Sequence, residues 1–306
     1  HEIKLLAGTE AIKSGIINSL TATSYAGFDF ETDLFMSPQT AQSKGVLTGN
    51  TQPPRTLFSK FARIDYTFRD KYIVNATVRN DKSSVFGAAN RSGTFPAFGL
   101  GYRISEEGFM QGIDLIQDLK LRGGWGQMGN QSPVNPLDQY ATFRSNAGYT
   151  NYDLNYSQNG GLVQGYTAFN ASTQSAKWES KTSVNAGFDA TLKGGWSVTF
   201  DWFKNTTNDL LVAPPRIPVG GILQQPYVNL GDIQNKGFEF MVTKRGNITS
   251  DLSYDASLTF THYKNKAIKI DDNPLTFIAG SASRLANVWR TQAGYPLSSY
   301  YGYQVD

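Results

Sequence analysis

The stretch that most constrains this sequence is FARIDYTFRDKYIVNATVRND, which runs from Phe61 to Asp81. Apolar side chains recur at every second position on both sides of the polar interval Arg69-Asp70-Lys71. They are Ala62, Ile64, Tyr66 and Phe68 before the interval, and Tyr72, Val74, Ala76 and Val78 after it. A period of two indicates β-strands, and an interval of this length predicts a hairpin.

The second face of this hairpin is polar and charged. It carries Arg63, Asp65, Arg79 and Asp81, with Ile73 as an apolar exception. Aromatic residues crowd the apolar face close to the turn. This arrangement is typical of a transmembrane barrel, in which apolar residues face lipid, polar residues face a wet lumen, and aromatic residues lie at the interface.

The composition agrees with this prediction. Hydrophobic residues make up 40% of the chain and charged residues 17%, with 30 Gly, 16 Tyr and 19 Phe, which favours strands and turns over helices. No apolar run approaches the ~18 residues that a membrane helix needs. A membrane-spanning form of this chain would therefore be a closed β-barrel, since lipid leaves no other way to satisfy a non-helical backbone.

Several classes of site are excluded or disfavoured. The chain has no cysteine, which excludes disulfides, thiolate metal sites and cysteine nucleophiles. The net charge is +3, and no dense Lys/Arg block could follow a phosphate backbone, so no nucleic-acid partner is expected. His262 with Asp255 or Asp271 could form part of a hydrolase site, but no nucleophile accompanies them. Asp271-Asp272-Asn273 lacks the further carboxylates of a calcium loop. We expect no enzyme, cofactor or metal.

The period of two recurs along the chain and predicts about ten antiparallel strands. Expected strands and hairpins cover residues 2–12, 57–81, 96–104, 119–125, 182–202 and 238–260, and we place one turn at Arg245-Gly246-Asn247. Inward glycines at Gly99 and Gly101 would leave room for something packed inside the barrel. His262 is expected at a strand end near the membrane interface.

The connections between these strands alternate in length. Short connections are expected at 69–71, 193–195 and 245–250, and long ones at 13–55, 130–176, 205–229 and 264–285. The connection 82–94 is shorter than the other loops on its side of the barrel. The connection 105–118 is longer than a turn and could hold a small periplasmic helix. Short turns on one side and long loops on the other predict an outer-membrane barrel with extracellular long loops.

Four strings resemble the SusC/RagA group of TonB-dependent outer-membrane transporters. They are GYRISEEGF (101–109), DLKLRGGWGQMGN (118–130), GDIQNKGFEF (231–240) and AGYPLSSYYGY (293–303). The resemblance implies a plugged barrel in the outer membrane of Bacteroidetes-type bacteria that imports oligosaccharides or peptides. It also implies energy supplied by the TonB-ExbB-ExbD complex and a SusD-like surface lipoprotein that acts as a lid.

About ten strands fall short of the roughly 22 in plugged transporters of this kind. Ten strands alone would leave two open edges in lipid. We therefore expect residues 1–306 to be the central part of a β-barrel domain. The plug, the TonB box and the terminal strands would lie elsewhere, and the remainder of the same barrel and outer-membrane lipid would be neighbours of this chain.

Two sets of residues are candidates for contacts. In the loop at 130–176, aromatic rings could stack on sugar or peptide groups while amides pair with them. This set is Tyr140, Tyr149, Asn151, Tyr152, Asn155, Tyr156 and Tyr166. The alternative, that these residues pack the loop on itself or on its lipoprotein lid, remains open. The second set faces the lumen and is expected to form salt bridges to a plug: Arg63, Asp65, Arg79, Asp81, Arg122, Asp189 and Asp201, with Lys120 alongside.

A second functional class remains open. A non-transporting surface protein, such as an adhesin or an assembly platform, could use the same barrel as its anchor. A TonB box and plug upstream would favour the importer, and their absence from the gene would favour the anchored surface protein. A soluble β-sandwich is a third alternative, but it would have to cover the apolar rows in water.

Overall fold

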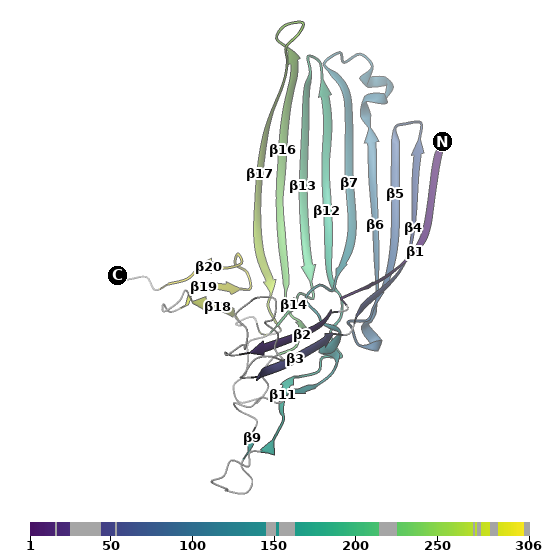
Figure 1. Cartoon of the computed structure of the whole chain (residues 1–306). Helices are drawn as coiled ribbons and strands as arrows, with labels where there is room; N and C mark the ends of the chain where they lie inside the picture. The colour runs from purple at the N-terminus through teal and green to yellow at the C-terminus, as the bar shows by residue number, and fades with distance from the viewer. Residues whose placement is uncertain are drawn as a thin grey trace, which may run out of the picture.

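The computed structural model describes residues 1–15, 17–24, 44–52, 54–144, 151–152, 163–213, 225–271, 273, 277–281 and 287–302. Nine long strands form one antiparallel sheet in the order β1-β4-β5-β6-β7-β12-β13-β16-β17 (Figure 1). Their bounds are β1 Glu2–Ser14, β4 Arg55–Phe68, β5 Tyr72–Ser83, β6 Ser92–Arg103, β7 Ile116–Asn130, β12 Glu179–Leu192, β13 Trp196–Asn208, β16 Asp232–Asn247 and β17 Ser253–Lys269. The predicted partial barrel wall is thereby confirmed.

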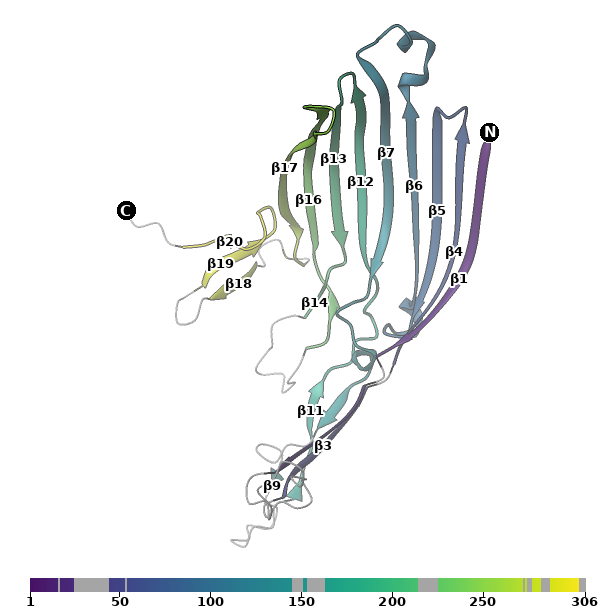
Figure 2. The same cartoon turned by 45° about the horizontal axis from the view of Figure 1, so that its top comes forward.

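Short connections lie at one end of the sheet and long loops at the other (Figure 1, Figure 2). The short connections are 69–71, 104–115, 193–195 and 248–252. The second of them holds two 3-10 turns, η2 (Ile104–Glu106) and η3 (Gly108–Met110), where a small helix was predicted. Among the described residues, no helix has the length and apolarity needed to cross a membrane.

The hairpin of β4 and β5 forms as predicted. Tyr66 lies opposite Val74, and Ile64 lies opposite Ala76. The turn places Arg69 (φ 52°) and Asp70 (φ 55°) in the left-handed region, which aspartate tolerates better than most residues. The polar interval therefore closes the two strands without a glycine.

Apolar side chains form continuous rows across the outer face of the sheet. One row runs through Leu5, Ile64, Ala76, Phe98 and Trp125, since each of these residues lies directly opposite the next. A second series stacks the rings of β12, β13, β16 and β17: centroid distances are 5.9 Å for Phe188–Phe200, 6.2 Å for Phe200–Phe238 and 5.9 Å for Phe238–Phe260. Rows this apolar and this exposed suit contact with lipid.

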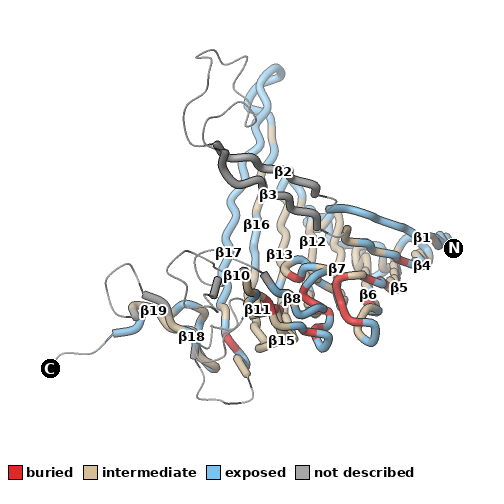
Figure 3. The backbone as a smooth tube through the Cα atoms, turned by 60° about the horizontal axis from the view of Figure 1, so that its bottom comes forward, coloured by how far each residue is buried: buried red, intermediate tan, exposed pale blue. Residues whose placement is uncertain are grey.

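The buried core of the described residues lies at the base of the long loops. Its members are Val85, Phe86, Phe95, Val134, Ala176, Trp178 and Leu211, with Leu57 and Tyr227 packed against them. In Figure 3, the long strands are tan and pale blue, while red segments gather near the loops. A one-layer wall has no interior of its own, so the loops supply the core.

Strand β6 begins at Ser92, four residues before the predicted start. The predicted start was wrong because the Gly, Ser and Asn residues of SSVFGAANRSGTF (83–95) indicated a loop up to Phe95. Pro96 pairs with Val78 of β5, whereas the ladder between β6 and β7 begins at Ala97. Proline is tolerated here because this part of β6 has a neighbour on only one side in the ladder.

The predicted turn at Arg245-Gly246-Asn247 is also wrong. These residues belong to β16 and pair with Asp255, Tyr254 and Ser253, and the connection is 248–252. A Cβ at Gly246 would lie 2.8 Å from the ring of Tyr254. Gly246 therefore makes room for a cross-strand aromatic ring and does not form a turn.

The long loops contain short ladders that the sequence did not predict. In the segment 13–55, β2 (Ile17–Ser24) pairs with β3 (Lys44–Gln52). Between β7 and β12 lie η4 (Pro136–Gln139), β8 (Thr142–Arg144), β9 (Asn151–Tyr152), β10 (Val163–Gln164) and β11 (Thr167–Asn170). β14 (Leu211–Val212) pairs with β15 (Val228–Asn229). After β17, which extends five residues beyond the predicted loop start, come β18 (Phe277–Ser281), β19 (Asn287–Gln292) and β20 (Ser299–Tyr300).

Candidate functional site

The inner face of the wall carries charges that pair within the sheet. Arg63 and Asp65 are two residues apart on β4, so both point inward, and their bonds measure 2.8 Å (Nε to Oδ2) and 2.7 Å (Nη2 to Oδ1). The Arg63 side chain is 50% exposed. This pair therefore leaves a cation partly open to the lumen.

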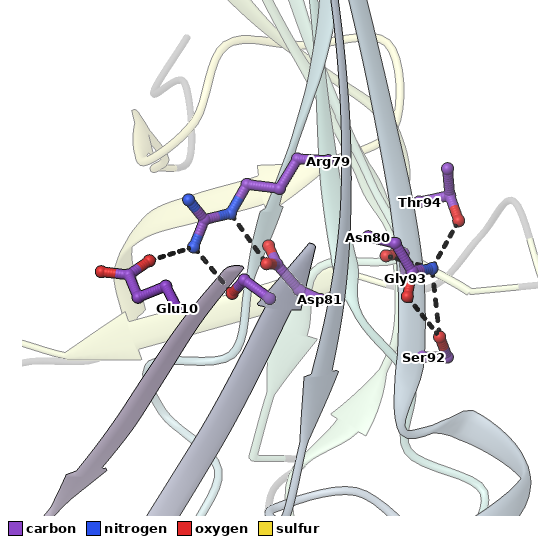
Figure 4. A network of polar contacts seen from close by, with 8 residues as sticks. Glu10, Arg79, Asn80, Asp81, Ser92, Gly93 and Thr94 are labelled. Atoms are coloured by element: carbon purple, nitrogen blue, oxygen red, sulfur yellow. Dashed lines mark hydrogen bonds and ion pairs between the residues drawn. The ribbon is translucent and has the colours of Figure 1, made fainter. Parts of the chain in front are cut away.

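Arg79 joins three strands near the long-loop end (Figure 4). Its Nε donates to Asp81 (2.8 Å), and its Nη2 donates to Glu10 of β1 (2.7 Å) and to Ser59 of β4 (2.8 Å). Ser59 and Asp81 are both buried. Asn80, the residue between Arg79 and Asp81, projects to the outer face and donates to Thr94 Oγ1 at 2.8 Å. This cluster, buried at Ser59 and Asp81 and partly exposed at Arg79 and Glu10, holds β1, β4 and β5 together from inside.

A second inner cluster is centred on Arg122 of β7. Its Nε lies 3.0 Å from Asp189 Oδ2 of β12, and its Nη1 and Nη2 lie 2.5 and 2.6 Å from the two carboxylate oxygens of Asp201 on β13. Gly187 lies directly opposite both Arg122 and Asp201. The missing side chain at Gly187 lets the guanidinium pass across β12.

The inward glycines lie in a shallow groove of the wall. A groove of about 380 Å³ is lined by glycines together with Asn75, Asn185, Lys120 and Arg122. A Cβ at Gly99 would lie 2.9 Å from the Asn75 amide, and one at Gly124 would lie 2.7 Å from Asn185 Oδ1. The wall's own amides therefore occupy part of the room that the sequence predicted.

At the short-turn end, Glu107 links its own connection, 104–115, to the neighbouring connection, 69–71. Its Oε1 accepts hydrogen bonds from the hydroxyls of Tyr72 (3.0 Å) and Tyr102 (3.1 Å), and its Oε2 accepts one from Lys71 Nζ (3.3 Å). These donors, Tyr72 foremost, hold the pKa of Glu107 below its usual range. Glu107 lies within the string GYRISEEGF, but no spacing in the sequence indicated its contact with Lys71 and the two tyrosines.

At the long-loop end, Trp178 anchors the loop base. Its ring lies between Phe86 (5.2 Å between centroids) and Phe95 (5.5 Å), and its Nε1 donates to the carbonyl of Arg91 at 3.0 Å. Asn229 joins the 209–231 connection to the 131–178 connection. Its side-chain amide accepts from Lys177 N (2.8 Å) and donates to the carbonyls of Lys177 (2.9 Å) and Asp209 (2.8 Å). No periodicity marks such contacts, which is why the sequence did not reveal them.

The structure describes part of the candidate ligand set. Tyr140 and Tyr166 are 58% and 70% exposed and flank the short ladder of β8 and β11. Asn151 and Tyr152 form β9, of which only the backbone is described. Tyr149, Asn155 and Tyr156 lie outside the described residues. The base of this loop is fixed by a capping box, in which Asn135 N donates to Asp138 Oδ2 at 2.9 Å.

Both histidines lie beside aromatic rings, and His1 is 4.6 Å from Phe68 between ring centroids. His262 is inside β17, beside the ring of Phe238 at 5.8 Å, so its predicted position at a strand end is wrong. Asp255 binds Arg245 (2.6 Å), and Asp271 accepts from the backbone N–H of Asn273 (2.9 Å). The described part of the chain holds no group of three or more His, Cys, Asp or Glu residues suited to a metal.

The comparisons with known proteins agree with one another. A family model described as TonB dependent receptor-like, beta-barrel matches residues 9–306. TonB-dependent receptor SusC of Bacteroides thetaiotaomicron is 35% identical over 257 residues, which cover 81% of this chain and 25% of that protein. TonB-dependent receptor P3 of Formosa agariphila is 29% identical over 253 residues, which cover 81% and 24%. The chain thus spans about a quarter of the length of these relatives.

A solved structure shares the fold. The structure of the RagAB peptide transporter superposes with a TM-score of 0.81 at 24% identity, covering 97% of this chain and 31% of that one. At this identity the match concerns the fold alone.

Proposed function

The chain belongs to the SusC/RagA group of the TonB dependent receptor-like β-barrel family, an outer-membrane family, and from this we propose that it forms part of the wall of an importer. The cargo in this proposal is an oligosaccharide or a peptide. The observation that carries the proposal is the 35% identity to receptor SusC over 81% of the chain. The continuous sheet supports it, since its outer face is apolar and its inner face is polar and ion-paired.

We propose further that these strands are one part of a longer cylinder. β1 and β17 form the two edges of the sheet. Backbone groups at an open edge cannot be satisfied in lipid, so both edges need partner strands. The remainder of the same barrel would supply these strands, with a plug inside the closed cylinder.

In this proposal, the polar and charged residues of the inner face divide into two kinds. Ser59 and Asp81 are buried within the wall and hold its strands together. Arg63 and Asp189, with side chains 50% and 43% exposed, retain surface toward the lumen. These two are the better candidates for plug contacts, which would have to break when the TonB-ExbB-ExbD complex pulls on the plug.

The long loops would form the ligand-binding roof. Tyr140 and Tyr166 expose their rings on a loop whose base is packed by Trp178 and Phe86. Exposed tyrosines on a fixed base lose little entropy on binding and can stack on sugar or peptide groups. With the loop asparagines they would bind cargo beneath a SusD-like lipoprotein lid.

The test is uptake of labelled oligosaccharides and peptides by cells that carry the full-length gene, with and without a functional TonB. Import requires TonB-dependent uptake of at least one of these classes. Tyr140→Ala with Tyr166→Ala should reduce binding to the cells, while Phe109→Ala, at the short-turn end and 72% exposed, should not. Surface binding of cargo without TonB-dependent uptake would favour the anchored surface protein instead.

A further inference from the structure

The charged residues of the wall are distributed unequally between its two faces. Toward the long-loop end, lysines occupy outward positions on six strands: Lys13, Lys60, Lys82, Lys204, Lys236 and Lys264. All are exposed. The acidic residues of the nine strands lie on the inner face, apart from Asp232 at a register shift, which accepts from the backbone of Asp209. The outer face therefore carries cations that its own carboxylates do not neutralise.

Three of these lysines form one row. Lys204 lies directly opposite Lys236, and Lys236 lies directly opposite Lys264. Side chains directly opposite in adjacent strands start about 5 Å apart, and like charges so placed repel one another. Within the described residues, none of the three forms an ion pair. An anion bound across the row would remove this repulsion.

The row lies at the edge of the apolar band. The next outward row toward the short turns is Trp202, Phe238 and His262, followed by Phe200, Phe240 and Phe260. On the other side, Thr206, Gln234 and Lys266 add polar donors. Lysine ammonium groups therefore adjoin a surface of aromatic rings, as at a membrane interface.

The opposite edge of the band is different. There the outward lysine is Lys244, and it is already engaged: its Nζ lies 5.1 Å from the centroid of the Trp196 ring and donates to the carbonyl of Gly194. The exposed cation row thus belongs to the long-loop side alone. That side faces the outer leaflet, because the long loops of these barrels are extracellular.

We propose that Lys204, Lys236 and Lys264 bind the phosphate of a lipid headgroup in the outer leaflet. The ammonium groups would neutralise the phosphate, and the acyl chains would lie along the rings of Phe238, Phe240 and Phe260. The adjoining rings favour a lipid over a free phosphate ion, which would leave them without a partner. The inference depends on the placement of the wall in the membrane and not on the proposed import.

The test uses the full-length protein in phosphatidylcholine nanodiscs with and without phosphatidic acid, with bound lipid counted by native mass spectrometry. Lys204→Gln, Lys236→Gln and Lys264→Gln combined should weaken retention of phosphatidic acid roughly 100-fold, because each lysine near an anionic surface contributes about five-fold. The matched control is Lys120→Gln, Lys181→Gln and Lys193→Gln, which removes equal charge from the inner face and a turn. The control should retain the lipid.

Three results would overturn the proposal. The first is that the triple variant of the lysine row retains phosphatidic acid as well as the wild type does. The second is that the control variant loses as much phosphatidic acid as the triple variant. The third is that inorganic phosphate displaces all of the bound lipid. If the triple variant does not fold, Lys236→Gln alone should weaken retention about five-fold, since it removes the central charge. An unchanged retention in that folded single variant would also contradict the site.

Discussion

The guanidinium of Arg122 on β7 binds both carboxylate oxygens of Asp201 on β13, although β12 lies between the two strands. The bond crosses Gly187, which has no side chain to obstruct it. Bidentate arginine–carboxylate pairs are among the stronger polar contacts in proteins. Three consecutive wall strands are thus joined by one side chain in addition to their backbone ladder.

Gly187→Ala is expected to destabilise the wall by about 1–3 kcal/mol, as overpacking does. The new Cβ would lie 2.2 Å from the carbonyl oxygen of Phe200 and 2.7 Å from Asp201 Oδ1. Gly123→Ala is the control, because a Cβ there has its nearest neighbour, a carbonyl oxygen, at 3.6 Å. The measurement is the urea midpoint of the full-length protein in lipid vesicles. Equal midpoints for the two variants would contradict the crossing.

A double-mutant cycle on Arg122→Gln and Asp201→Asn should give a coupling free energy of about 1–3 kcal/mol. Both side chains are about three-quarters buried and their contact is bidentate. The same cycle on Arg63→Gln and Asp65→Asn should give a clearly smaller coupling, because that pair is more exposed to solvent. A coupling for the second pair as large as the first would show that burial does not set these values.

The sequence predicted contacts within a strand better than contacts across long loops. Arg63 with Asp65, and Arg79 with Asp81, follow from a spacing of two residues, which places both members on one face. Glu10 also binds Arg79, but β1 and β4 are separated by residues 15–54, so no local pattern sets their register. The same holds for Arg122 and Asp201.

A glycine does not mark a turn where an aromatic side chain of the neighbouring strand packs over it. Gly246 indicated a turn but lies in β16 beneath Tyr254. The signal that could have corrected this is the aromatic residue eight positions later, on the returning strand. The loop base around Trp178 could not be predicted in this way, because its contacts join loops that share no period.

Glu107→Gln is expected to loosen the 104–115 connection at neutral pH. The pKa of Glu107 is held below the unperturbed value of 4.5, foremost by the hydroxyl of Tyr72. Its contribution to stability is therefore complete above about pH 4.5 and is lost as the pH falls through the lower folded pKa. Hydrogen exchange across this connection should be faster in the variant at neutral pH.

The difference between Glu107→Gln and the wild type should disappear in acid, where the carboxyl group is protonated and both proteins lack the charge. Glu106→Gln is the matched control, since it removes the same charge from the neighbouring position. Its exchange should follow the wild type at every pH. A difference between Glu107→Gln and the wild type that persists unchanged in acid would mean that charge is not what holds the connection.

Trp178→Ala is expected to destabilise the loop base by about 3–5 kcal/mol, as removal of a buried aromatic side chain does. The change removes the ring between Phe86 and Phe95 and leaves the carbonyl of Arg91 without the indole donor. Proteases should then cut within 84–91 and 131–178 at concentrations that spare the wild type. The wall should keep its own resistance, because its ladder does not depend on this core.

Two further variants separate the contributions of Trp178. Trp178→Phe keeps an aromatic ring but lacks the N–H donor, so its protease resistance should be intermediate. Trp196→Ala removes a tryptophan that is 43% exposed on the outer face at the other end of the sheet, and the long loops should stay resistant. Equal cutting of the long loops in Trp178→Ala and Trp196→Ala would mean that loss of any tryptophan destabilises the whole protein. Cutting of the long loops in Trp178→Ala but not in Trp196→Ala would mean that the Trp178 ring holds these loops on the wall.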